Sequence, residues 1–144
     1  MTLKKHTLIH KTGKVFKDKR GWLKKILDGN FSSCIEVYSK KGSTRANHYH
    51  KRDTHFMYII SGEILYFYKS RKKQAKTKFK LMKKNDLFFT PAMFEHMAYF
   101  PKNTHFLAFS PRKRSRSDYE NDLIRINMHD YPEVKKAIKK NIKN

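Results

Sequence analysis

The chain has 144 residues and one cysteine, Cys34, so it is long enough for one buried core and cannot form an internal disulfide. Its longest wholly apolar stretch spans only residues 56–60 and no signal-peptide region is evident, so we expect a cytoplasmic protein without membrane insertion. The net charge of +22 is spread over the whole length, without a helix-turn-helix, zinc-finger or RNA-binding signature. It therefore indicates a solvated surface that attracts anions rather than a specific nucleic-acid partner.

Short segments rich in aromatic and β-branched residues recur along the chain, separated by turn residues such as Gly62 and Asn85. In chain order, strands are predicted at 22–27, 33–38, 55–60, 64–68, 78–82, 87–90, 96–100 and 105–109. Many short strands at this spacing are typical of an antiparallel β-sandwich or barrel, and we expect roughly ten of them.

One helix is predicted, at about 130–141 near the C-terminus. Asp130 is a candidate N-cap ahead of Pro132, and lysines follow toward the other end, as the helix dipole favours. Val134, Ile138 and Ile142 recur four residues apart and would form one apolar stripe. No linker or repeat divides the chain, so we expect a single domain over 1–144 with its core over 15–127.

Histidines are concentrated between residues 48 and 55, where three of the chain's eight occur. If this segment begins as a β-strand, His48 and His50 point to the same face, roughly 6.6 Å apart along the chain. A turn over 51–54 would then bring His55 back beside them. The segment predicts a site at which imidazoles converge on one metal ion or one bound substrate.

The spacing of these histidines and two glycines resembles the first signature of the cupin superfamily. The matching residues are Gly42, His48, His50, His55 and Gly62, and the family usually carries glutamate where this chain has His55. The resemblance implies a cupin jelly-roll β-sandwich or barrel, all-β apart from the short C-terminal helix.

Residues 85–100 resemble the second cupin signature, with Pro91 and His96 at the matching positions. Asn85 and Met93 stand where the family has glycines, and Phe100 stands where it has asparagine. The change at Asn85 is mild, because asparagine also tolerates a positive φ. The two signatures together cover residues 42–100, the middle of the chain.

In cupins the corresponding side chains converge inside the barrel and often hold a divalent metal. The resemblance therefore implies a metal site formed by His48, His50, His55 and His96. Four imidazoles suit one transition metal such as zinc or iron, and also copper or nickel, better than manganese or magnesium. The alternative is a metal-free pocket in which these histidines act as acids and bases or hydrogen-bond the substrate. The other histidines are interpreted as surface or core residues: His6, His10, His105 and His129.

Three further segments resemble cupins that process nucleotide sugars. Residues 18–23 resemble the Asp-X-Arg-Gly-X-Leu first strand of these proteins. Residues 45–51 resemble the Arg-Gly-X-His-Ala-His-Lys segment of the dTDP-sugar 3,4-ketoisomerases, with Ala46 in place of glycine, and a related segment of capsule-sugar enzymes. Residues 118–125 resemble the strand that closes the ketoisomerase domain.

The resemblance implies an isomerase or epimerase of a 4-keto nucleotide sugar in surface polysaccharide biosynthesis. Such a reaction needs a base that removes a proton α to the carbonyl and an acid that returns one, and histidine titrates near neutral pH. The catalytic candidates are His48, His50 and Tyr119, with His50 preferred as the base. The substrate-binding candidates are Arg20 and Arg45 for the pyrophosphate, and Arg45, Lys51 or Tyr99 for the enolate oxygen, which Tyr119 or a bound metal could also stabilise.

Two other functional classes fit the same residues. An all-histidine cupin can bind iron and activate oxygen as a dioxygenase, and a non-catalytic cupin can bind sugars or regulate a partner. We also expect a homodimer, because jelly rolls often pair their exposed sheet edges. The apolar segments 7–9 and 15–16 are the candidates for exchange between subunits.

Overall fold

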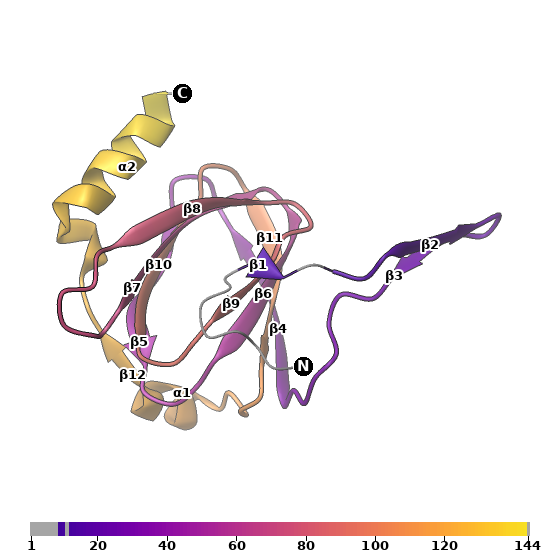
Figure 1. Cartoon of the computed structure of the whole chain (residues 1–144), viewed down its shortest axis with the longest axis horizontal. Coiled ribbons are helices and arrows are strands. Elements are labelled where there is room, and N and C mark those ends of the chain that lie inside the picture. Colours follow the sequence, from indigo (N-terminus) through magenta and orange to yellow (C-terminus); the bar gives the residue numbers. More distant parts are fainter. Residues whose placement is uncertain (1–8, 11, 144) are drawn as a thin grey trace.

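The computed structural model describes residues 9–10 and 12–143 and shows two five-stranded antiparallel sheets that enclose a common core (Figure 1). The first sheet has the order β1 (Ile9–His10), β9 (Leu87–Thr90), β6 (His55–Ser61), β11 (Thr104–Ser110), β4 (Ser33–Ser39). The second has the order β12 (Leu123–Arg125), β5 (Thr44–His50), β10 (Phe94–Tyr99), β7 (Glu63–Ser70), β8 (Lys78–Lys83). The all-β class predicted from the sequence is confirmed, and each predicted strand overlaps an observed one.

The core lies between the two sheets because alternate residues of each strand face inward. On β7, Ile64 and Tyr66 are fully buried there and pack with Phe88 of β9 and Phe100. The intervening residues Leu65 and Phe67 are also buried, but on the outer face of the second sheet. β7 is therefore apolar on both faces, since helical segments near the C-terminus cover the outer one.

The cover of this outer face consists of the short 3₁₀-helix η1 (Met128–Asp130) and the helix α2 (Pro132–Lys143), which confirms the predicted C-terminal helix. Met128 and Val134 are fully buried against the sheet, and Ile138 is partly buried. Ile142 is exposed, so the apolar stripe contacts the sheet over only part of the helix. Neither α-helix of the described residues is long and apolar enough to cross a membrane.

Three residues that stand in place of family glycines all have a left-handed backbone conformation. The φ angles are 70° at Ala46, 73° at Asn85 and 62° at Met93. This confirms the interpretation that Asn85 keeps the conformation of a turn glycine. At the other two positions a side chain is tolerated at a backbone geometry that usually favours glycine.

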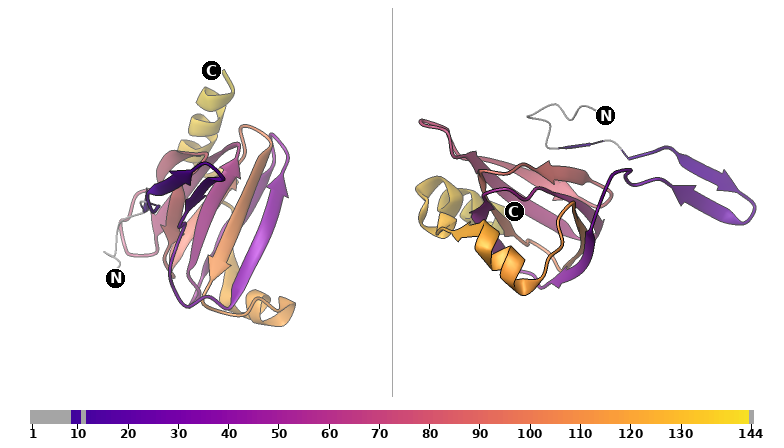
Figure 2. Two further views of the ribbon diagram at one scale, coloured as in Figure 1. Left: turned by 90° about the vertical axis from the view of Figure 1, so that its right-hand side faces the viewer. Right: turned by 90° about the horizontal axis from the view of Figure 1, so that it is seen from below.

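The hairpin of β2 (Val15–Asp18) and β3 (Gly21–Lys24) projects away from the two sheets (Figures 1 and 2). Among the described residues its strands pair only with each other, so the hairpin, which lies within the predicted core range 15–127, adds no strand to the two sheets. Four of its apolar side chains are exposed, namely Val15, Phe16, Trp22 and Leu23. The other predicted exchange segment, 7–9, lies outside the described residues except for Ile9.

The segment that was expected to form a closing strand over 118–125 is partly helical. Residues Arg116–Asp122 form the helix α1, and only Leu123–Arg125 form the strand β12, which pairs with β5. The helix begins where the Ser115 hydroxyl accepts a hydrogen bond from the Asp118 N–H at 3.2 Å. This local capping outweighs the tendency to form a strand and turns Tyr119 toward the interior of the barrel end.

Candidate functional site

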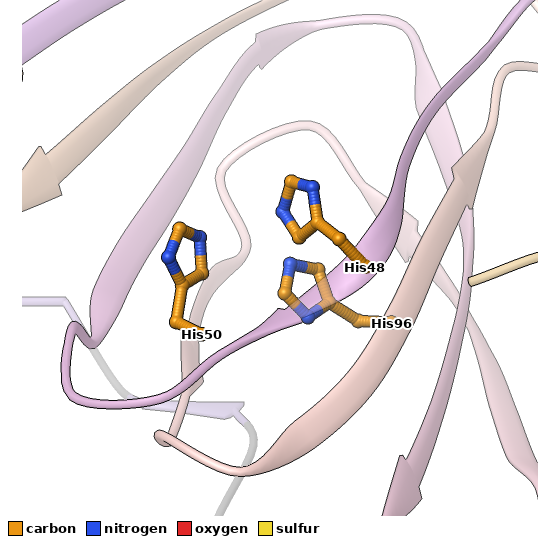
Figure 3. A group of neighbouring side chains, drawn as sticks. All are labelled: His48, His50 and His96. Carbon is orange, nitrogen blue, oxygen red and sulfur yellow. The ribbon is translucent and has the colours of Figure 1, made fainter. Parts of the chain in front are cut away.

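Three histidines meet on the inner face of the second sheet (Figure 3). His48 and His50 come from β5, and His96 comes from β10, where it pairs directly with His48. One ring nitrogen from each lies within 4.8 Å of the others, and all three side chains are buried. The predicted convergence of His48, His50 and His96 is therefore present in the structure.

His55 lies beside this cluster at the start of β6, in the facing sheet. Its ring centroid is 5.2 Å from that of His96 and 5.9 Å from that of His50. Its nitrogens are not part of the group that could share one ion. The turn over 51–54 thus returns His55 to the site as expected, at a position adjacent to the three-histidine set.

His50 is oriented by a carboxylate. Its Nδ1 lies 3.2 Å from Oδ2 of Asp122. The Asp122 carboxylate also accepts hydrogen bonds from two backbone N–H groups, that of Arg52 at Oδ1 and that of Asp53 at Oδ2. Burial alone would raise the pKa of Asp122, but the hydrogen bonds from Asp53 and His50 hold it below its ordinary value. Asp122 therefore remains ionised, fixes the His50 ring and can stabilise a positive charge on it.

Each of the other three histidines has a ring nitrogen without a hydrogen-bond partner among the described residues. His96 donates its Nδ1 hydrogen to the carbonyl of Phe94 at 2.9 Å, which leaves Nε2 as a free acceptor. Among the described residues, the Nδ1 atoms of His48 and His55 have no hydrogen-bond partner although they are buried. A buried polar atom without a partner is costly, so these nitrogens are suited to a ligand.

Burial lowers the pKa of all four histidines, with smaller contributions from their neighbours and from Arg114. The pKa of His48 falls to about 2 and that of His96 to about 4. The rings are therefore uncharged at neutral pH. Neutral imidazoles can accept a proton or bind a metal ion, so the site is poised for either chemistry.

The stability of the protein should fall as the pH drops below about 6.5. Unfolded histidines take up protons near the ordinary value of 6.5, whereas His96 does so only near 4 and His48 near 2 when folded. The unfolded state then binds more protons, so each such histidine should cost about 1.4 kcal/mol per pH unit within this window. Urea unfolding at pH 7, 6 and 5 measures the slope.

His96→Gln should reduce the number of protons taken up on unfolding in this window by about one. Val134→Ala, which changes no titrating group, should leave that number unchanged. Equal slopes in the wild-type protein and His96→Gln would contradict the assignment of a buried, uncharged ring.

A cavity of about 450 Å³ opens beside His50 and is lined by Tyr119, Arg114 and Lys51 among others. The Tyr119 ring lies 5.5 Å from the His50 ring and 6.0 Å from the His48 ring. Burial raises the pKa of Tyr119, so its hydroxyl stays protonated and can donate. The catalytic candidate Tyr119 is therefore placed at the site, and Lys51 lies at its rim.

Arg114 is a functional candidate that the sequence analysis missed. Its side chain is only 15% exposed, and its guanidinium lies 5.4 Å from the Tyr119 ring centroid. The Nε atom is 3.8 Å from a carboxylate oxygen of Asp53 and makes no hydrogen bond among the described residues. In the sequence it belongs to the basic run 112–116, where nothing distinguishes it from its exposed neighbours.

Three predicted substrate-binding residues lie away from this cavity. Tyr99 is packed on the outer face of the second sheet, because β10 alternates and His96 occupies the inner face. Arg45 donates to the Ser39 hydroxyl and the Tyr38 carbonyl at the opposite end of β5. Arg20 is at the turn of the projecting hairpin, paired with Asp18. None of these three residues lines the cavity beside His50.

A larger cavity of about 810 Å³ lies between the β7–β8 and β9–β10 connections. Its lining combines Tyr68 and Phe94 with basic residues such as Lys69 and Arg71, and it contains none of the four histidines. The smaller cavity beside His50 therefore carries the candidate chemistry.

No family model and no curated protein sequence matches this chain. Its fold is similar to solved structures of sugar-nucleotide enzymes. The dTDP-4-dehydrorhamnose 3,5-epimerase from Sulfolobus tokodaii has a TM-score of 0.68 and 19% identity, covering 84% of this chain and 78% of that one. The sugar 3,4-ketoisomerase QdtA from Thermoanaerobacterium thermosaccharolyticum, in complex with TDP, has a TM-score of 0.66 and 18% identity, covering 91% and 95%.

The 3′-monoepimerase ChmJ from Streptomyces bikiniensis, in complex with dTDP-quinovose, has a TM-score of 0.70 and 12% identity, covering 86% of this chain and 71% of that one. At these identities the likeness concerns the arrangement of the strands. The chain has the cupin fold, in the form found in dTDP-sugar epimerases and ketoisomerases.

Proposed function

We propose that this protein is an isomerase or epimerase that moves a proton α to the keto group of a 4-keto nucleotide sugar. The observation that carries the proposal is the set of buried, uncharged histidines, of which His50 lines a cavity together with Arg114, the least exposed arginine there, and the protonated Tyr119. Similarly folded proteins include dTDP-sugar epimerases and a ketoisomerase, which supports this substrate class. The proposed reaction takes place in the cytoplasm, as one step in the biosynthesis of a surface polysaccharide.

In this mechanism His50 removes the proton from the carbon next to the keto group, and Asp122 stabilises the imidazolium that forms. The electron pair of the broken C–H bond moves onto the carbonyl oxygen, which becomes an enolate. The Arg114 guanidinium supplies the positive charge near that oxygen. Tyr119 then donates a proton to the same carbon from the opposite face, which gives the epimer. For the positional isomer it donates the proton to the former carbonyl carbon, while the hydroxyl proton of the neighbouring carbon passes to the enolate oxygen, so that the keto group moves to that carbon.

The proposal is tested by incubating the purified protein with 4-keto sugars linked to dTDP, UDP or GDP and following the products by NMR. Conversion of one substrate to an epimer or positional isomer is the expected result. Conversion that requires oxygen would instead favour the dioxygenase alternative. Binding of a nucleotide sugar without any conversion would favour a non-catalytic sugar-binding protein and would overturn the proposal.

We also propose that His48, His50 and His96 can bind one transition-metal ion. Their nitrogens lie within 4.8 Å of one another, compared with about 3.3 Å between ligands of a tetrahedral zinc ion, so small ring movements would suffice. The unpartnered Nδ1 of His48 and the neutral rings fit such an ion. When bound, the metal would polarise the keto oxygen of the substrate.

Titration of the protein with zinc should reveal about one site per chain. The double variant His48→Ala, His50→Ala should abolish this binding, whereas His105→Ala, which changes a partly exposed histidine on β11, should retain it. No binding at neutral pH after soaking with zinc and iron would restrict the site to metal-free acid and base catalysis.

We further propose a homodimer that forms through the projecting β2–β3 hairpin. Phe16, Trp22 and Leu23 are each more than half exposed there, which is a large apolar surface for a lone hairpin. Light scattering at micromolar concentration and moderate salt should give twice the chain mass. Phe16→Ser with Leu23→Ser should produce a monomer, while Phe79→Ser, at an exposed position on β8, should not. A monomeric wild-type protein would contradict the proposal.

A further inference from the structure

We infer that His129, through its hydrogen bond with Asn47, is a positioning residue that holds His48 on the inner face of the second sheet, beside His50 and His96. The inference depends on the proposed function only for the role given to His48. Neither residue lines the histidine cavity. The support comes from the course of β5 and from the contacts that its irregular part makes with η1.

β5 contains a bulge directly before His48. His48 pairs with His96, and Met97, the next residue of β10, pairs with Ala46, so Asn47 has no partner on β10. Both Ala46 and Asn47 have positive φ angles, of 70° and 58°. Two consecutive non-glycine residues in this conformation are unfavourable, so surrounding contacts must hold them there.

The bulge decides which way His48 points. In a regular strand Thr44 and His48, four residues apart, would share one face. Here Thr44 pairs with Tyr99 on the outer face, whereas His48 pairs with His96 on the inner face. The extra residue therefore reverses the alternation. A return to regular pairing would turn His48 away from the inner face or bring Thr44 onto it.

Three hydrogen bonds anchor the bulged residue to the chain segment 126–129. The carbonyl of Asn47 accepts from the Ile126 N–H at 2.9 Å, and its side-chain oxygen accepts from the Met128 N–H at 3.1 Å. Its side-chain nitrogen lies 2.7 Å from Nε2 of His129. Because the amide oxygen faces an N–H donor, the amide nitrogen is the donor to His129, and Nε2 must be the unprotonated acceptor.

His129 thus accepts a hydrogen bond from Asn47 and holds the amide in the one orientation that also satisfies Met128. The Thr44 hydroxyl, 3.3 Å from the same nitrogen, connects the ring to the other side of the bulge. Through this anchor, η1 on the outer face of the sheet fixes the bulge and thereby the orientation of the His48 side chain on the inner face.

The test compares three variants by NMR of histidine-labelled protein without substrate. The rings of His48 and His96, with centroids 4.7 Å apart, should give a nuclear Overhauser effect in the wild-type protein. His129→Leu, which lacks an acceptor, should weaken this signal several-fold. His129→Gln, whose side-chain oxygen can accept from Asn47, should restore it. Val134→Ala removes buried volume on α2 and should lower the melting temperature while keeping the signal.

An undiminished signal in His129→Leu would overturn the inference, and so would an equal loss in Val134→Ala, which would show a general effect of stability. If His129→Leu does not fold, Asn47→Gly permits the same backbone conformation, removes the two side-chain hydrogen bonds of the anchor and should lose the signal in the same way. Since no substrate is used, failure of the proposed enzymatic function would leave this result unaffected.

Discussion

His50→Asn should lower turnover of the 4-keto nucleotide sugar by about 10²-fold or more, because the variant loses its proton-transfer group. The wild-type reaction in D₂O should give a product that carries deuterium on the carbon next to the keto group. In the variant both exchange and turnover should be suppressed. Asparagine retains hydrogen-bonding capacity toward Asp122 but cannot take up the proton.

The control for this experiment is His105→Asn, which changes a partly exposed histidine near Glu36 and should leave exchange and turnover unchanged. Circular dichroism should show the same β-rich fold for both variants. An active His50→Asn protein, or a wild-type product without deuterium, would remove His50 from the mechanism.

Arg114→Met should reduce kcat by about 10²- to 10³-fold, the usual cost of removing one group that stabilises a developing oxyanion. Methionine fills much of the same space but carries no charge, so the enolate would form in a cavity without its cation. Arg114 is shielded from water, and a charge there acts through a less polar medium than one at the surface. The kcat measured in steady-state assays and the rate of deuterium incorporation in D₂O should fall by the same factor.

Lys113→Met provides the matched control, because Lys113 precedes Arg114 in the chain, lines the same cavity and is exposed. Its loss should weaken substrate binding slightly, mainly at low salt, and leave kcat unchanged. If Arg114→Met retains normal kcat while its KM rises, the guanidinium binds the ground state and does not stabilise the enolate.

The sequence was sufficient to predict most of the strands and the shared face of His48 and His50, and the cupin resemblance added His96. Period-two alternation places His48 and His50 on one face, and burial on both faces makes residues 64–68 of β7 continuously apolar. The turns follow from glycine and asparagine, which accept positive φ angles, and Asn85 bears this out. These features depend on neighbours in the chain, which a sequence displays directly.

The remaining features depend on contacts between distant segments. Tyr99 faces outward because it follows Ala98, which is part of the inner core, and the sequence alone does not say which face that is. Arg114 differs from Arg112 and Lys113 only in burial, which the helix α1 and Asp53 bring about. His129 is half-buried near the C-terminus, and its link to Asn47 spans 82 residues.

The exposed hairpin has a practical consequence for following assembly in solution. Trp22 is the single tryptophan of the chain, and 67% of it is accessible to water. An indole in water emits at longer wavelengths than one in an apolar contact, and no other tryptophan contributes to the emission. The intrinsic fluorescence of the unlabelled protein is thus a direct optical report on whether this hairpin is free or covered. A dilution series read at a single excitation wavelength would give the association constant.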